Sequence, residues 1–429
     1  MKVLVVGSGG REHAMCRALA TDPKADLLIA PGNPGTATLG RNLAVTAADI
    51  AGVVAAARGE QVDLVIPGPE LPLTRGLSDA LAADGIACCG PSAAAARLEG
   101  SKVFTRRLTE AAGVPSPRYR IVTDGKDIAA AMAVFASPPV VKADGLAGGK
   151  GVFLPDDEES CAAEVRGLLG GRLGAAGSRV VLEEHLVGVE ASLFWLCHGT
   201  RIVPLPHARD YKRIGDGDRG PNTGGMGAVS PNPAIDPVLE KTVRENIILP
   251  VLHLLQAEGI PFVGFLYAGL MLTTSGPKLL EFNVRLGDPE AQAVLPRLED
   301  GVFGDVCRWA ACGGKGEPDV WIDPRSTCAV VLAADGYPKQ PCLGDPITID
   351  EKLPGPDRWF IHAATRWVDG ALVSAGGRVG AVVARAETAE DARRLSYGGT
   401  ELVEWGHKIL RSDIGLSSGA ARWSGLPDG

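Results

Sequence analysis

Short apolar runs alternate with longer stretches of helical pattern along residues 1–100. The apolar runs at 3–6, 27–30, 64–66 and 86–88 indicate strands, because each is short and bounded by polar or glycine-rich segments. Strands that alternate with helices are typical of a parallel sheet covered by helices. The pattern therefore predicts an N-terminal parallel α/β domain over residues 1–100, with a helix opening after Ser92.

The rest of the chain is predicted to hold two further domains and a tail. A large domain at 101–324 contains a compact insertion at about 119–187, with strand-like runs at 139–143 and 180–184, an acidic helix near 156–169 and a glycine-rich, flexible connection at 167–177. A smaller α/β domain at 325–415 has strand-like runs at 328–333, 359–364 and 380–386 and a helix over 387–397. Residues 416–429 are rich in glycine, serine and proline and are expected to be a flexible tail.

A hairpin near the end of the large domain carries the most informative polar residues. The runs at 262–272 and 278–282 indicate two antiparallel strands. Residues two apart share one face of a strand, so Glu281, Asn283 and Arg285 are expected together. Hard oxygen atoms bind Mg²⁺ and a guanidinium fork binds phosphate. This face predicts a metal–nucleotide site, and an ordinary solvated strand face is the alternative.

A glycine-rich loop at 142–152 lies between two strand-like runs and is predicted to form a hairpin flap. Its glycines, among them Gly148, Gly149 and Gly151, let the backbone approach phosphate oxygens, and Lys150 can neutralise their charge. Lys142 is expected to point inward, where a buried lysine needs an anionic partner. The loop is not a Walker motif, because neither Ser/Thr nor a helix follows Lys150. A structural turn with an exposed lysine is the alternative.

Two other segments offer weaker signals. The strand-like run ending at Glu183 and Glu184 leads into a short linker whose backbone can pair with an adenine edge, and a carboxylate beyond it can bind ribose hydroxyls. The loop at 210–227 is long, polar and rich in glycine, and long ordered loops are usually functional. Surface loops without a ligand are the alternative in both cases.

The first glycine loop, at 7–13, follows a strand and precedes a helix, so its backbone amides can bind a phosphate. Glu12 replaces the last glycine of a dinucleotide-binding fingerprint, and no acidic residue ends the second strand. A nicotinamide enzyme is therefore disfavoured, whereas a phosphate-bearing substrate near Gly9, Gly10 and Arg11 stays open beside a simple capped turn. Glu70 follows the third strand, at an edge where ligands bind in open α/β sheets.

Composition and charge restrict the cellular location and the kinds of partner that are expected for this protein. The net charge of −8 argues against a nucleic-acid partner. No apolar run reaches the roughly 18 residues of a membrane span, and the start reads as a first strand rather than a signal peptide, so a cytoplasmic protein without membrane contact is expected. The 9 cysteines include no zinc-like spacing and are expected to be reduced thiols, mostly buried.

Taken together, these motifs closely resemble the glycinamide ribonucleotide synthetases, which are ATP-grasp ligases of purine biosynthesis. The similar segments are 7–13, 68–70, 98–102, 141–152, 220–227, 264–269 and 281–290. The resemblance implies an N-terminal α/β domain, an ATP-grasp unit with a mobile lid and a small C-terminal domain. It also implies that glycine is activated by ATP to glycyl phosphate and then joined to 5-phosphoribosylamine, by a protein that is a monomer or a weak dimer.

The resemblance also implies residue roles. Glu281 and Asn283 would hold Mg²⁺ (or Mn²⁺), and Arg285, Lys142 and Asp210 would act in catalysis. ATP would be bound by Lys102, Lys142, Gly148, Gly149, Lys150, Gly151, Glu183, His185, Leu186 and Glu190. Substrate contacts would come from Gly9, Gly10, Arg11, Glu70, Asn222, Thr223, Gly224, Gly225, Met226 and Asp288.

Several positions depart from the family pattern, and most are expected to lie beside substrate groups. They are Leu71, Gly148, His185, Val189, Arg209, Tyr211, Leu286 and Ala291. Arg209 replaces a neutral glutamine, and a cation beside Asp210 would favour a more acidic substrate. A paralogue with a different carboxylic acid or amine is therefore the alternative to glycine ligation. A nucleotide-binding regulator without ligase activity would lack Glu281, Asn283 or Lys142, and none is missing.

Overall fold

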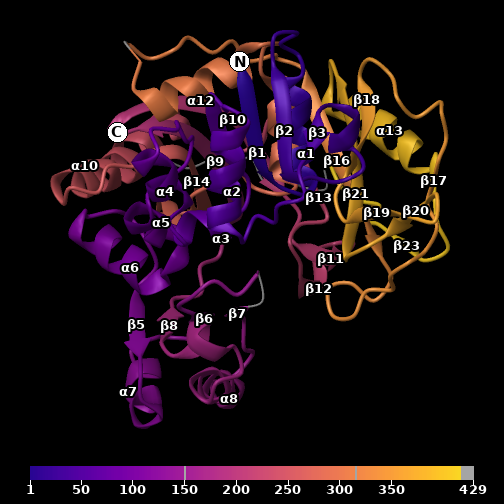
Figure 1. Cartoon of the computed structure of the whole chain (residues 1–429). Coiled ribbons are helices and arrows are strands. Elements are labelled where there is room, and N and C mark those ends of the chain that lie inside the picture. The colour runs from indigo at the N-terminus through magenta and orange to yellow at the C-terminus, as the bar shows by residue number, and fades with distance from the viewer. Residues whose placement is uncertain (149–150, 315, 417–429) are drawn as a thin grey trace.

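The structure is a computed structural model that describes residues 1–148, 151–314 and 316–416 (Figure 1). The predicted tail after residue 416 lies outside the described residues. The predicted three-part α/β architecture is confirmed, with a parallel N-terminal sheet, a large central unit that carries a protruding lid, and a C-terminal unit. No helix of the described residues is long and apolar enough to cross a membrane.

The N-terminal unit is a parallel sheet of four strands in the order β3-β2-β1-β4. Its elements are β1 (Lys2–Gly7), α1 (Gly10–Leu19), β2 (Asp26–Pro31), η1 (Thr36–Thr38), β3 (Arg41–Asn42), α2 (Ile50–Gly59), β4 (Leu64–Pro67), α3 (Glu70–Thr74), α4 (Leu77–Ala83) and α5 (Ala93–Gly100). Ser92 caps α5, as predicted. The strand predicted at 86–88 is wrong, because Cys88 forms only an isolated bridge with Val65.

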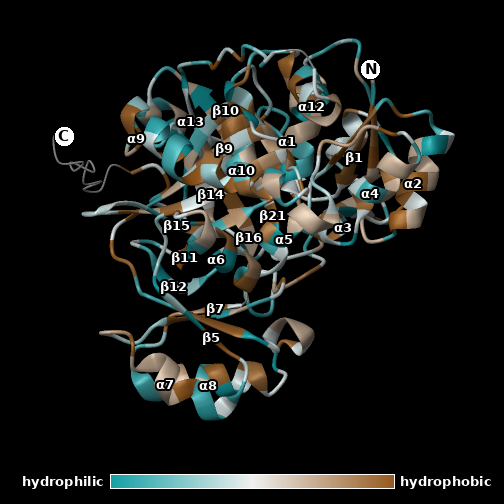
Figure 2. Cartoon of the chain, turned by 90° about the vertical axis from the view of Figure 1, so that its left-hand side faces the viewer, coloured by the Kyte–Doolittle hydropathy of each residue, from teal (hydrophilic) through white to brown (hydrophobic). Residues whose placement is uncertain are grey.

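The lid is an antiparallel sheet in the order β5-β8-β6-β7 that projects below the body, with helices α7 and α8 at its far end (Figures 1 and 2). Its elements are β5 (Tyr119–Val122), η2 (Gly125–Asp127), α7 (Ile128–Met132), β6 (Val140–Ala143), β7 (Val152–Phe153), α8 (Glu158–Leu169), η3 (Gly174–Gly177) and β8 (Val180–Glu183). β6 and β7 form the predicted hairpin flap. The predicted flexible connection at 167–177 is instead the end of α8 followed by η3.

A nine-stranded sheet runs through the central and C-terminal units in the order β15-β14-β9-β10-β13-β16-β21-β18, with β23 beside β16. Its strands are β9 (Val189–His198), β10 (Arg201–Asp210), β13 (Gly227–Ser230), β14 (Val263–Thr273), β15 (Gly276–Asn283), β16 (Ser326–Ala334), β18 (Arg358–His362), β21 (Arg378–Ala386) and β23 (Lys408–Ile409). Because β13 pairs with β16, the sheet is continuous across residue 324.

Helices and short hairpins complete these two units. They are α6 (Lys102–Ala111), β11 (Arg213–Gly215), β12 (Arg219–Asn222), α9 (Pro237–Val243), η4 (Arg244–Ile248), α10 (Leu249–Ala257), α11 (Glu290–Val294), η5 (Leu295–Arg297), α12 (Val302–Cys312), β17 (Thr348–Ile349), β19 (Thr365–Val368), β20 (Ala371–Ser374), α13 (Ala389–Thr400) and β22 (Val403–Glu404). One apolar core joins all three units, since it contains Met15, Phe303 and Ile361.

Two histidines join the N-terminal and C-terminal units. The backbone amide of His362 donates to Nδ1 of His13 at 2.8 Å, and Asn33 Nδ2 donates to the His362 carbonyl at 3.1 Å. Burial lowers the pKa of His13 to about 3 and that of His362 to about 4. As the pH falls below 6.5, both rings take up protons in the unfolded chain, but they stay neutral in the folded protein.

This arrangement predicts that stability falls as the pH is lowered. The unfolded chain binds protons at the ordinary histidine pKa of 6.5, whereas the folded protein does not. The unfolding free energy should therefore decrease by about 1.4 kcal/mol per pH unit for each of the two histidines between about pH 6.5 and about pH 5. Urea titrations across this window should show a weaker pH dependence for His362→Gln. The variant of the exposed His253, His253→Gln, should follow the unchanged protein, and equal slopes for all three would contradict the assignment.

Candidate active site

The edge strand β15 carries the polar face that the sequence predicted. A β-bulge at Leu280 inserts one residue opposite β14, so that Leu270 pairs with Leu279 and Gly269 with Glu281. Beyond the bulge, Phe282 and Val284 enter the core, and Glu281, Asn283 and Arg285 take the other side. Arg285 NH2 donates to Asn283 Oδ1 at 3.2 Å, which confirms that these residues lie together.

Glu281 is held in its ionised form. Burial alone would raise its pKa, but the cations of Lys102, Lys212, Lys142 and Arg285 hold that pKa at about 2. Lys102 Nζ lies 3.6 Å from Glu281 Oε2. An ionised carboxylate beside the Asn283 amide oxygen is a hard-oxygen donor pair that fits Mg²⁺ or Mn²⁺. No cluster of three or more His, Cys, Asp or Glu in the described part of the chain could hold a metal alone, so this pair requires further ligands such as phosphate oxygens.

Arg285 lies between two carboxylates of the N-terminal unit. Its NH2 group is 2.8 Å from Glu99 Oε1, and its Nε is 3.3 Å from Glu70 Oε2. Glu99 also accepts the Val284 amide at 2.8 Å, and these contacts fix the chain direction after β15. Sequence reasoning missed Glu99, although it follows the apolar Leu98 inside one of the segments that resemble the family.

Lys142 points inward and has the anionic partner that was predicted. Its Nζ lies 2.7 Å from Glu183 Oε2, and Arg106 contacts the same carboxylate through Nε at 2.6 Å and NH2 at 2.8 Å. Burial would raise the pKa of Glu183, but Arg106 and Lys142 lower it to about 2. Both oxygens of Glu183 are thus used inside the protein, so a direct side-chain contact with adenine, as expected from the sequence, is not the role that this geometry favours.

Arg106 was missed by the sequence analysis. It lies on the buried side of α6 together with Val103 and Thr109, spaced three residues apart. A cation at a core-facing helical position needs a buried anion, and this spacing was the available signal. Arg106 also donates to the carbonyls of Leu279 and Leu280 at 3.1 and 2.6 Å, so it connects the lid to the bulge of β15.

The other predicted nucleotide residues that the structure describes lie in the flap and in the segment after β8. The Gly151 carbonyl accepts the Ala143 amide at 2.8 Å within the flap, whereas Gly149 and Lys150 lie outside the described residues. Gly148 has φ +56°, a conformation that favours glycine. In the segment after β8, His185 is exposed and Leu186 is buried.

Glu190, on β9, forms an ion pair with Lys212. Its Oε2 lies 3.0 Å from Lys212 Nζ, and Glu190 is the main cause that raises the pKa of Lys212. Lys212 also contributes to the low pKa of Glu281. Lys212 lies in the loop predicted at 210–227, and the structure brings it to the centre of the charged cluster.

Asp210 faces a second buried carboxylate. One of its oxygens, Oδ1, is buried and has no hydrogen-bond partner among the described residues. Burial and then the neighbouring Glu290 raise the pKa of Asp210 well above its ordinary value. Gly225, at φ +109°, allows the loop to approach closely, because a Cβ atom there would lie 2.6 Å from Asp210 Oδ1. This pair of acids is suited to a small group that donates hydrogen bonds or carries a positive charge.

The loop at 222–227 is fixed by residues of the C-terminal unit. Arg378 NH1 donates to the carbonyls of Gly224 and Asp288, and Tyr337 accepts the Gly224 amide at 2.9 Å. Within the loop, Thr223 Oγ1 accepts the Gly225 amide at 2.9 Å. Asn222 ends β12, and Met226 is buried in the body. The loop predicted to bind substrate is therefore ordered by contacts that lie far away in the sequence.

The first glycine loop is a capped turn. Gly9 donates its amide to Glu12 Oε2 at 2.5 Å, and Glu12 Oε1 lies 2.7 Å from Arg11 Nε. Arg11 NH1 also donates to the Leu286 carbonyl at 3.1 Å. Asp288 keeps a low pKa, because Arg378 and Arg11 outweigh the effect of its burial. The structure brings Gly9, Gly10, Arg11, Glu70 and Asp288 to one place, but Gly9 and Arg11 are already bonded within the protein.

Several departures from the family pattern lie next to residues assigned to the site, among them Leu71 beside Glu70 and Val189 beside Glu190. The expectation that Arg209 adds a cation beside Asp210 is wrong, because its guanidinium stacks on Tyr211 at 4.9 Å from the ring centre. Successive residues of a strand point to opposite faces, and Asp210 takes the other one. Tyr211, Leu286 and Ala291 are buried in the core. The Leu286 carbonyl accepts a hydrogen bond from Arg11. The effect of these three changes on the substrate stays a prediction.

The lid, the flap and the acidic edge strand define the ATP-grasp class, and solved structures support this class. Biotin carboxylase from Campylobacter jejuni, crystallised with a β-γ-ATP ligand, shares the fold with a TM-score of 0.72 at 13% identity over 95% of this chain and 92% of that chain. A crystal structure of phosphoribosylamine–glycine ligase from Thermotoga maritima matches with a TM-score of 0.85 at 35% identity, over 96% of this chain and all of that chain.

Sequence comparison identifies the family. The N, ATP-grasp (A) and C domains of phosphoribosylglycinamide synthetase match residues 1–99, 100–291 and 327–417. The phosphoribosylamine–glycine ligase of Allochromatium vinosum is 44% identical over 97% of this chain and 98% of its own length. That of Caulobacter vibrioides is 45% identical over 97% and 98%. The chain belongs to the phosphoribosylglycinamide synthetase family, and it is an ATP-dependent ligase.

Proposed function

We propose that this protein joins glycine to 5-phosphoribosylamine in purine biosynthesis. The observation that carries the proposal is similarity along almost the whole chain to relatives named phosphoribosylamine–glycine ligase. In the proposed reaction, a carboxylate oxygen of glycine attacks the γ-phosphorus of ATP, and ADP leaves. The amine then attacks the acyl carbon of glycyl phosphate, so that an amide forms, inorganic phosphate leaves and one proton is released.

The nucleotide is proposed to lie between the lid and β15. Lys102, Lys142 and Lys150 would neutralise its phosphates, and the flap glycines would approach them through the backbone. The segment at 183–186 would pair with adenine through its backbone, because the Glu183 side chain is used by Lys142 and Arg106. Glu190 would bind the ribose after exchanging its partner Lys212.

Glu281 and Asn283 would hold the divalent metal, proposed to be Mg²⁺ or Mn²⁺. When bound, the metal supplies positive charge at the phosphate oxygens and holds the triphosphate in place. The low pKa of Glu281 keeps this carboxylate ionised at neutral pH. Arg285 would steady the transferred phosphoryl group from the same face of β15.

Glycine is proposed to bind at Asp210. Its ammonium group would be recognised by the two carboxylates of Asp210 and Glu290, one of which presents an unpartnered oxygen. Binding of a cation would return Asp210 to its ionised form, since the raised pKa comes from burial and from a like charge. The ordered backbone of the loop at 222–227 would close around so small a substrate.

The ribosylamine is proposed to lie against the first glycine loop. Since the Gly9 amide is bonded to Glu12, phosphate recognition there would fall to Gly10 and to Arg11, whose Nε and NH1 groups are bonded to Glu12 and Leu286 and whose NH2 group would face the phosphate. Glu70 and Asp288 would accept hydrogen bonds from the sugar hydroxyls. Arg378, which contacts Asp288 Oδ2 at 3.4 Å, would keep that carboxylate in place.

ADP release in the presence of a panel of amino acids tests the proposal. Strong release is expected only with glycine plus phosphoribosylamine generated in place, and Asp210→Asn should raise the KM for glycine at least about tenfold. Asp319→Asn, at an exposed aspartate outside the site, is the matched control. Equal ADP release with a different acid or amine would contradict this proposal and favour a paralogue that uses that substrate.

We also propose a cytoplasmic monomer or weak dimer. Large exposed apolar side chains such as Trp321, Trp367 and Val187 lie on separate segments, which offers no single broad patch among the described residues for an obligate partner. Sedimentation equilibrium at micromolar protein should give the mass of one chain, and a stable higher oligomer would overturn this assignment.

A further inference from the structure

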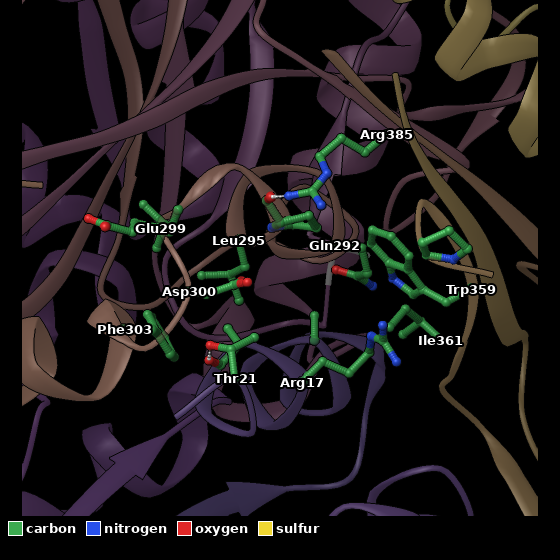
Figure 3. A pocket seen from close by; sticks show the side chains of 15 residues that line it. Arg17, Thr21, Gln292, Leu295, Glu299, Asp300, Phe303, Trp359, Ile361 and Arg385 are labelled. Carbon is green, nitrogen blue, oxygen red and sulfur yellow. Dashed lines mark hydrogen bonds between the residues drawn. The ribbon is translucent and has the colours of Figure 1, made fainter. Parts of the chain in front are cut away.

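A cavity of about 230 Å³ lies where the three units of the protein meet (Figure 3). Helix α1 contributes Arg17, the turn after it contributes Thr21, the segment from α11 to α12 contributes Gln292 and Phe303, and the C-terminal unit contributes Trp359. None of the residues to which the ligase reaction was assigned lines it. At about 30 Å³ for each water molecule, the space corresponds to about eight non-hydrogen atoms, which is the size of a small metabolite.

Gln292 presents an unused acceptor to this cavity. Its side chain is only 2% exposed, and Nε2 donates to Asp288 Oδ1 at 2.8 Å. The other end, Oε1, has no hydrogen-bond partner among the described residues, and Figure 3 shows it directed toward the cavity. A buried amide oxygen without a donor costs about 1–3 kcal/mol. A ligand here must therefore bring an N–H or O–H group.

Arg17 presents an unused positive charge. Its guanidinium lies over the Trp359 ring at 4.8 Å from the centre, which fixes the flat face of the group. No carboxylate is paired with Arg17 in the part of the chain that the structure describes. The other arginine of the wall, Arg385, is already bonded to Asp323, Asp357 and the Pro296 carbonyl. Arg17 is thus the cation of this wall that is available to bind an anionic group of a ligand.

The remaining wall gives the ligand its other properties. Leu295, Phe303 and Ile361 are buried and apolar. Asp300 is exposed at the rim, where its charge attracts a cation and repels a dianion such as phosphate, whereas the Glu299 carboxylate points away from the cavity (Figure 3). A ligand that satisfies all these groups carries one carboxylate, one ammonium group and an aliphatic body.

We propose that this cavity binds an aliphatic α-amino acid of about the size of valine, leucine or isoleucine. Its carboxylate pairs with Arg17, its ammonium group donates to Gln292 Oε1 and is attracted by Asp300, and its side chain lies against Leu295 and Phe303. The inference is independent of the substrates of the ligase reaction, because the cavity and the β15 site share no residue.

Calorimetric titration of the whole protein with L-leucine, L-isoleucine and L-valine tests the site. At least one of them should bind, whereas 3-methylbutylamine, which lacks the carboxylate, and 4-methylpentanoate, which lacks the amine, should bind at least about tenfold more weakly. Absence of binding by all three amino acids would overturn the proposal and leave a cavity filled by water alone.

Two variants locate the binding. Arg17→Met keeps the packing on Trp359 and removes the charge, and Ala18→Phe fills the cavity; both should weaken binding at least about tenfold. Ala20→Phe, at an exposed position that ends the same helix, is the matched control and should bind normally. All three should keep their ligase activity and their circular dichroism spectrum. Undiminished binding by both cavity variants would overturn the assignment.

Discussion

Glu281→Gln should reduce ATP-dependent ADP release at least about a hundredfold while leaving the fold intact. The substitution keeps the shape of the side chain but removes the charge that four neighbouring cations hold ionised at a pKa of about 2. A neutral amide is a poorer ligand for a divalent cation and no longer balances Lys102. The measurement is steady-state ADP release over a series of Mg²⁺ concentrations.

The matched control for this experiment is Glu258→Gln, at an exposed glutamate that follows α10. Its activity should equal that of the unchanged protein, and both variants should unfold at nearly the same urea concentration. Near-normal ADP release by Glu281→Gln at every metal concentration would refute the metal assignment.

Arg106→Met should destabilise the folded protein by about 3–5 kcal/mol. The change removes two of the three short contacts to the Glu183 carboxylate, and a charge that is 1% exposed is left with Lys142 alone. The carbonyls of Leu279 and Leu280 also lose their donor. Urea unfolding followed by circular dichroism should show a midpoint at a lower urea concentration than that of the unchanged protein.

The neighbouring Arg107 provides the control, because it is exposed on the same helix. Arg107→Met should change the unfolding free energy by less than about 0.5 kcal/mol, as is usual for a surface position. If the two methionine variants unfold together, the buried charge cluster does not carry the stability assigned to it.

Local pattern was sufficient to predict much of the fold. The strands β14 and β15, the flap hairpin, α8 and the C-terminal strands were predicted to within a few residues, because each has its own apolar pattern and turn residues. The strand predicted at 86–88 is wrong, because a short apolar run does not determine whether a neighbouring strand pairs with it along its whole length.

The polar contacts of the candidate site needed the structure. Glu99 and Arg285, or Arg106 and Glu183, lie far apart in the sequence, and no local spacing relates them. Arg378 reaches the loop at 222–227 from a different unit. Arg209 shows the opposite error, because its place beside Asp210 in the sequence suggested proximity, while strand alternation sends its cation to Tyr211.

The bulge at Leu280 adds one residue to β15, so the face that each side chain of the candidate site takes depends on the number of residues that follow the bulge. Before it, Leu279 faces the core; after it, Phe282 and Val284 do, which no uninterrupted strand of period two could arrange. Deleting Leu280 would remove the bulge and place Glu281 directly after Leu279, so Glu281 and Asn283 would keep their face and Phe282 would stay in the core. Deleting a residue beyond the bulge, such as Phe282, would instead turn Asn283 toward the core. Length changes of one residue after the bulge should therefore be excluded among working relatives, whereas side-chain alternation allows loss of the bulge residue itself.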